Sequence, residues 1–195
     1  MDSISYILGL ILFFILLKIF VDSDYFFLTC MQSPLDDETY CVRERDNIND
    51  AVALLSKMNT TLKKLVVYVY EKYPNKDCVK RLKEKYNPSR VVEINPLSKH
   101  TAYSENKGKK LAFCLNKDKN INSKLIDENT LIFVGIHELS HIASENKGHD
   151  DEFWGNFKFL LENAVEAKLY VPIDYKKNNV QYCGMKITDS PYYDL

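Results

Sequence analysis

Three of the four histidines of this 195-residue chain lie between positions 137 and 149. The stretch 137–154 reads HELSHIASENKGHDDEFW. His137 and His141 are four residues apart, so a helix would place them on one face, about 40° from each other. Two imidazoles arranged in this way can bind one tetrahedral metal ion. The stretch therefore has to form a helix, a reversal and a second helix, and this requirement constrains the fold more than any other feature.

Helix signals surround the two histidines. Asp127 is a suitable N-cap for a helix over 128–145, and Gly148 follows the end of that helix. A second helix is expected to begin after Asp150, with two acidic residues in its first turn, where the helix dipole favours them. Apolar residues lead into the first helix and form one face of the second: Leu131, Ile132, Phe133 and Ile136, then Phe153, Phe157, Leu160, Leu161 and Ala164.

The pattern predicts a single Zn²⁺ bound by His137, His141 and His149. Glu138 is turned about 100° from His137, so it can reach a metal-bound water without being a ligand and can act as the general base. If His149 is not the third ligand, the carboxylates of Asp151 and Glu152 are the alternatives. His100 lies alone in a polar segment and is expected at the surface.

The rest of the chain predicts an α+β domain over residues 48–195. Apolar residues recur at helical spacing from Asp50 to Pro74, and a shorter helix is expected over 76–86. The segments 90–94 and 110–115 are typical of short strands, with a turn at 106–108 before the second. Residues 23–47 show no sustained period and are interpreted as a tether, and the last 25 residues are expected to be irregular.

Residues 4–21 are apolar except for Lys18, which predicts an uncleaved transmembrane signal-anchor over residues 1–22. A cleaved signal peptide is the alternative, but neither a basic start nor a small-residue cleavage site is present. A buried core helix is disfavoured because the stretch is apolar on every face. We therefore expect a single-pass membrane protein. Lys18, Arg43 and Arg45 lie on the C-terminal side of the run and favour a body in the cytoplasm or the interior of a virion.

Charge and cysteine content exclude other classes. The chain has 26 Lys and Arg against 27 Asp and Glu, which argues against nucleic acid as a partner. The five cysteines are odd in number and form no CxxC pair, so a complete disulfide framework or a cysteine zinc finger is not expected. Cys114 and Cys183 are interpreted as small buried apolar residues. Nothing in the composition sets the oligomeric state.

The sequence HELSH followed by GHDDEFW resembles the WLM and SprT-like zinc metallopeptidases. The resemblance covers residues 90–185 and is strongest over 131–160. It implies a zincin-like fold, a zinc site at His137, His141 and His149, Glu138 as base, and a strand at 110–115 that forms an edge for an extended substrate. The segment Tyr182-Cys183-Gly184-Met185 is similar to the tail of short, membrane-anchored versions from large DNA viruses.

Two departures from this family matter. The spacer between His141 and His149 is longer than in the compact metzincin pattern HExxHxxGxxH, which weakens the assignment of the third ligand. The neutral body lacks the basic regions of family members that repair DNA–protein crosslinks.

The leading hypothesis is a membrane-anchored zinc metallopeptidase acting on a protein or peptide. The alternative is a membrane-anchored structural or interaction protein, such as a virion protein, with a non-catalytic zinc site. The same ligands would also serve the hydrolysis of a non-peptide bond. Asp150 could orient His149 or cap the second helix, and Tyr182 could face the substrate oxyanion. Phe153, Trp154 and Phe157 are expected to pack in the core.

Overall fold

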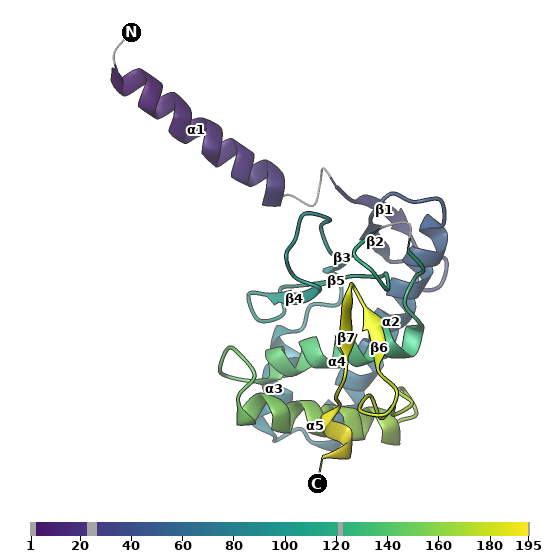
Figure 1. The fold of residues 1–195 in the computed structure, drawn as a ribbon. Coiled ribbons are helices and arrows are strands. Elements are labelled where there is room, and N and C mark those ends of the chain that lie inside the picture. Colours follow the sequence, from purple (N-terminus) through teal and green to yellow (C-terminus); the bar gives the residue numbers. More distant parts are fainter. Residues whose placement is uncertain (1–2, 23–26, 121–122, 195) are drawn as a thin grey trace.

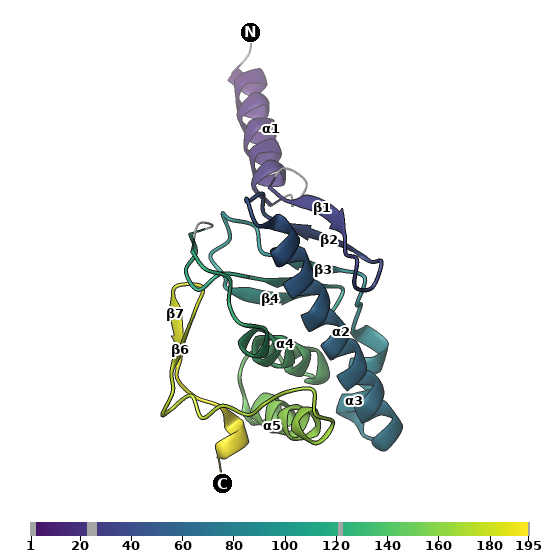
Figure 2. The ribbon, with the colours of Figure 1, turned by 90° about the vertical axis from the view of Figure 1, so that its right-hand side faces the viewer.

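A small sheet lies above two stacked helices, and a long helix crosses beside both (Figures 1 and 2). The computed structural model describes residues 3–22, 27–120 and 123–194. The sheet order is β3 (Val91–Glu93), β5 (Lys110–Phe113), β4 (Ala102–Glu105), with β5 parallel to β3 and antiparallel to β4. The helices are α2 (Ile48–Lys72), α3 (Asp77–Lys85), α4 (Glu128–Ala143) and α5 (Asp151–Glu166). This mixed content confirms the expected α+β class.

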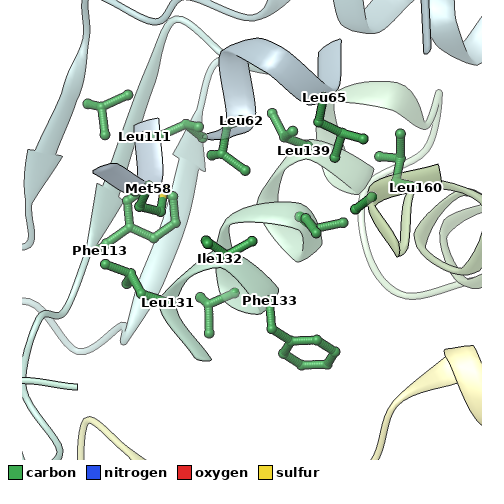
Figure 3. Packing of buried hydrophobic residues seen from close by; sticks show 14 of the residues in the cluster. Met58, Leu62, Leu65, Leu111, Phe113, Leu131, Ile132, Phe133, Leu139 and Leu160 are labelled. Atoms are coloured by element: carbon green, nitrogen blue, oxygen red, sulfur yellow. The ribbon is translucent and has the colours of Figure 1, made fainter. Parts of the chain in front are cut away.

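The core lies between α2, the sheet and α4 (Figure 3). Leu62 and Met58 of α2 and Leu139 of α4 have no exposed surface, and neither does Phe113 of β5. Burial of each such side chain contributes roughly 1.5–3 kcal/mol to folding. Helix α4 thus packs against α2 and the sheet, and α5 also packs against it.

The sheet differs from the expected one in its edge. The strand predicted over 110–115 is β5, and β5 is the central strand rather than an edge. The edge strands are β3 and β4. The sequence did not indicate β4, because Ala-Tyr-Ser-Glu is short and lacks a clear apolar alternation. The expectation of a substrate edge at 110–115 is therefore wrong.

The segment expected to be a tether contains a hairpin of β1 (Thr29–Gln32) and β2 (Thr39–Val42). A disulfide joins its strands, Cys30 to Cys41. The hairpin contacts α2 and β3. The residues that follow it are held by ion pairs. Arg43 Nε lies 2.8 Å from Glu93 Oε1, and Arg45 pairs with the same fully buried carboxylate. Residues 23–26 of the expected tether lie outside the described residues.

The C-terminal segment, where an irregular chain was expected, forms a second hairpin. Strands β6 (Val180–Tyr182) and β7 (Met185–Ile187) pass in front of α4 (Figure 1), and a short helix, η2 (Pro191–Tyr193), follows. The hairpin turn is tied to the end of β5 by the disulfide Cys114–Cys183. Cys114 and Cys183 are buried as expected, but they form a disulfide and are not merely small apolar residues; Cys78 is free and buried.

The first helix, α1 (Ser3–Asp22), projects away from the body (Figure 1). Lys18 lies among its mostly apolar residues. Among the described residues, no helix combines the length and apolarity that crossing a membrane requires. The expected transmembrane anchor and single-pass localisation are therefore wrong, because an apolar run does not by itself give a helix the length and apolarity that crossing requires. Residues 1–2 of the expected anchor lie outside the described residues.

Candidate metal centre

Helix α4 carries the first two histidines, and its own sequence explains where it begins and how it lies. The Asp127 side chain accepts a hydrogen bond from the backbone N–H of Thr130 at 2.9 Å, which confirms the predicted cap. Most of α4 is buried, but His137 and His141 are only partly buried. The two imidazoles therefore open toward the surface on the side that faces α5.

The chain reverses at Gly148, whose φ of +107° suits glycine and disfavours other residues. Helix α5 then begins with Asp150 as its N-cap, because the Asp150 carboxylate accepts from the N–H of Phe153 at 3.0 Å and from Asn146 at 3.0 Å. Of the two roles considered for Asp150, the structure gives it the cap. His149 stands between the reversal and this cap, facing α4.

The three histidines meet. Their candidate ligand atoms all lie within 4.8 Å of one another, and Nε2 of His149 is 3.1 Å from Nε2 of His137. Tetrahedral coordination with metal–nitrogen bonds of 2.0–2.1 Å would separate two ligand nitrogens by about 3.3 Å. The ring of Phe153 lies below all three, with centroids 4.4–4.9 Å away. This arrangement could bind one metal ion.

The imidazoles of His137 and His141 are in the form that a metal needs. Burial lowers the pKa of His137 to about 3, and the neighbouring histidines add to this effect. Burial lowers the pKa of His141 to about 4, with a further contribution from His149. Both rings are therefore neutral at pH 7 and have lone pairs available for coordination.

Glu138 lies beside the histidines with 4% of its surface exposed. Burial raises its pKa to about 8. Its Oε2 atom has no hydrogen-bond partner among the described residues. A buried carboxyl group without a partner is costly, and it is explained if a cation or a polarised water belongs next to it. The donor set and this unpartnered oxygen both fit a catalytic metal.

The other candidates from the sequence are not part of the histidine group. His100 is exposed and contacts Tyr103, as expected for a surface histidine. Glu152 pairs with Arg81 at 2.7 Å, and neither it nor Asp151 joins the histidine group among the described residues. The Tyr182 hydroxyl donates to the carbonyl oxygen of Thr101 at 3.1 Å.

The histidines open into a cleft of about 1130 Å³ between β4, α4, the α4–α5 loop and the β6–β7 hairpin. Phe153 and Phe157 pack in the core as expected, but Trp154 is 44% exposed and lines the cleft. Four lysines line it as well: Lys107, Lys109, Lys147 and Lys186. The acidic residues in the lining are Glu138 and Asp189, and Asp189 is paired with Lys176 at 3.1 Å. The cleft is thus positively charged in a chain of net charge −1.

Comparison with known proteins finds relatives in viruses. The chain is 26% identical over 163 residues to an uncharacterized protein of Acanthamoeba polyphaga mimivirus, covering 82% of each chain. It is 32% identical over 84 residues to an uncharacterized protein of Invertebrate iridescent virus 6, covering 43% of this chain and 47% of the relative. A third uncharacterized protein, from Invertebrate iridescent virus 3, is 35% identical over 65 residues, covering 33% of this chain and 39% of the relative.

No protein-family model matches the chain. Among solved structures, the fold is similar to Wss1 from Saccharomyces cerevisiae with a TM-score of 0.48 and 17% identity, covering 65% of this chain and 88% of that chain. At that level of similarity, neither a shared fold nor a shared activity follows.

Proposed function

We propose that the chain is a zinc-dependent peptidase with a zincin-like core, in which His137, His141 and His149 bind one Zn²⁺. One observation carries the proposal: three imidazoles converge within 4.8 Å beside a buried carboxylate that has an unpartnered oxygen. A site that only stabilises the fold would have no use for that carboxylate, because structural zinc sites are closed by four protein ligands. Similarity to viral proteins supports a viral origin.

Zinc held by three imidazoles would supply a bound water whose pKa is near 7. Glu138 is the residue that moves the protons. Burial gives its carboxyl a pKa of about 8 in the metal-free protein, and a cation bound beside it would favour the ionised form that can accept a proton. It would accept a proton from the attacking water and return it to the leaving amine. Phe153, packed under the three rings, keeps the ligands in place.

The cleft suits an extended peptide. Strand β4 pairs with β5 on one side, and the residues of β4 also line the cleft, so the free edge of β4 can add a substrate strand by backbone hydrogen bonds. The exposed aromatic side chain of Trp154 provides an apolar surface for one substrate side chain. The four lysines favour acidic residues elsewhere in the peptide, because a cleft of one charge concentrates ligands of the other.

Digestion of a peptide library tests the proposal. The full chain, purified and supplied with zinc, is incubated with peptides made from a whole proteome, and new termini are identified by mass spectrometry. We expect cleavage by the zinc-loaded protein and none by Glu138→Gln or by protein stripped of metal. Equal cleavage by Glu138→Gln would refute the role of this residue. An intact library, with zinc bound, would favour a non-catalytic zinc site.

A further inference from the structure

The ring of His149 packs against Phe153 and Trp154, but no described residue other than another histidine fixes its ring nitrogen. His149 is exposed, it lies outside both helices, and its ring nitrogen meets only His137 in a hydrogen bond among the described residues. The glycine before it, at φ +107°, has no atom within 4 Å of the place where a side chain would begin. Besides these ring contacts, the position of His149 depends on the backbone on both sides of it: the capped start of α5, and residues 144–147 before the glycine.

Lys107 holds that backbone. Its ammonium group donates to three consecutive carbonyl oxygens, those of Ser144 at 2.8 Å, Glu145 at 2.9 Å and Asn146 at 2.7 Å. These carbonyls follow the C-terminus of α4, where unsatisfied oxygens and the helix dipole both favour a cation. An ammonium group has three donors, and here all three are used on one loop.

The turn that carries Lys107 is itself fixed against the helices. Asn106 and Lys107 have positive φ angles of 47° and 56°, and Gly108 has a φ of +102°. A side chain at Gly108 would begin 2.7 Å from the carbonyl oxygen of Lys85 and 3.0 Å from Ile142 of α4. The turn thus lies directly on the ends of α3 and α4. Its unusual backbone, which most residues disfavour, directs the lysine across the end of α4.

Two other elements hold the same loop from the opposite side. Arg81 of α3 donates to the carbonyl oxygen of Ala143 at 2.7 Å and to the carboxylate of Glu152 at 2.7 Å. Glu152 in turn accepts from the N–H of Glu145, with oxygens at 3.0 and 3.1 Å. Among these contacts, Lys107 alone spans three peptide groups, and it does so on the side of the cleft.

We propose that Lys107 is a positioning residue for the third metal ligand: it fixes the α4–α5 loop so that His149 meets His137 and His141. The inference rests on the proposed zinc site. It also connects that site to the substrate edge, because the turn of Lys107 directly follows β4. A peptide bound along β4 would lie next to the residue that holds the metal ligand in place.

A double-mutant cycle on zinc affinity tests this role. Zinc dissociation constants are measured on the full chain by competition with a chelator, for Lys107→Met alone and in a His149→Ala background. In the wild-type background we expect the affinity to fall 10–100-fold, the usual loss when a group that orients a ligand is removed. In the His149→Ala background the same change should alter the affinity less than about 2-fold, because the ligand that Lys107 positions is gone.

Three variants complete the test. Lys107→Arg keeps a cation with several donors and should recover most of the affinity. Lys64→Met removes an exposed lysine of α2 and should leave zinc binding unchanged. If Lys107→Met does not fold, Lys107→Gln takes its place in the same cycle.

Two results would overturn the inference: an unchanged affinity in the Lys107 variant, or an equal loss in both backgrounds. Absence of zinc binding by the wild type would instead refute the proposed function, and this inference with it.

Discussion

Replacement of Glu138 by glutamine should stabilise the metal-free protein at neutral pH, although it removes the proposed base. The reason is the burial of this carboxyl group, which is 4% exposed and has an oxygen without a partner among the described residues. In the unfolded chain the group ionises near its ordinary pKa of 4.5, but in the folded protein its pKa is about 8. At a pH between these two pKa values, folding therefore requires that Glu138 take up a proton.

The size of the effect follows from linkage. A folded-state pKa above the unfolded value means that stability is fully present below pH 4.5 and is lost as the pH rises through about 8. The loss is about 1.4 kcal/mol per pH unit, so at pH 7 it reaches about 3 kcal/mol. Glutamine has a similar shape and no charge in either state. Since its amide must also be buried, we expect a net gain of about 2 kcal/mol at pH 7.

Urea unfolding of metal-free wild type and Glu138→Gln at several pH values measures this gain. The difference in unfolding free energy should be smallest at pH 4.5, increase up to pH 8 and then level off. The effects of the histidines cancel in this difference, because both proteins contain them. Glu84→Gln, which changes an exposed glutamate of α3, should give no such increase. A gain that is absent or independent of pH would refute the reasoning.

Three further predictions concern the ligands, the disulfides and the substrate. The metal-free protein should lose stability as the pH falls from 6.5 to about 3, because His137 and His141 stay neutral only when folded; urea unfolding across this range checks it. Loss of the Cys114–Cys183 disulfide, which spans 69 residues, should cost about 4 kcal/mol, against about 3 kcal/mol for the disulfide of the β1–β2 hairpin, which spans 11; calorimetry of the alanine pairs compares them. Peptides with acidic flanks should be cleaved faster than basic ones, and Lys186→Glu should reduce the preference; equal rates at low salt would contradict a role of the cleft charge.

The candidate site could be predicted because its chemistry is local in sequence. His137, Glu138 and His141 share one helix, and the reversal at Gly148 brings His149 back within a few residues. Helical spacing and capping residues carry this information directly, and the Asp127 cap of α4 is where the sequence predicted it.

The walls of the cleft could not be predicted because they depend on contacts between distant segments. Strand β4 is recognisable only from its pairing with β5, and the turn at 106–108 gives no indication that Lys107 reaches the end of α4. The pairing of Cys114 with Cys183 likewise depends on where the fold places the last hairpin. The error about the N-terminal segment arose differently, from an apolar run interpreted without its structural context.

X-ray absorption at the zinc edge tests the central claim most directly. The zinc-loaded full chain should show three imidazole nitrogens at about 2.0–2.1 Å and one further light atom. His149→Ala should lose one imidazole from this shell, whereas His100→Ala, which changes the exposed histidine, should match the wild type. A wild-type spectrum with sulfur ligands, or one that His149→Ala leaves unchanged, would contradict a zinc site made of His137, His141 and His149.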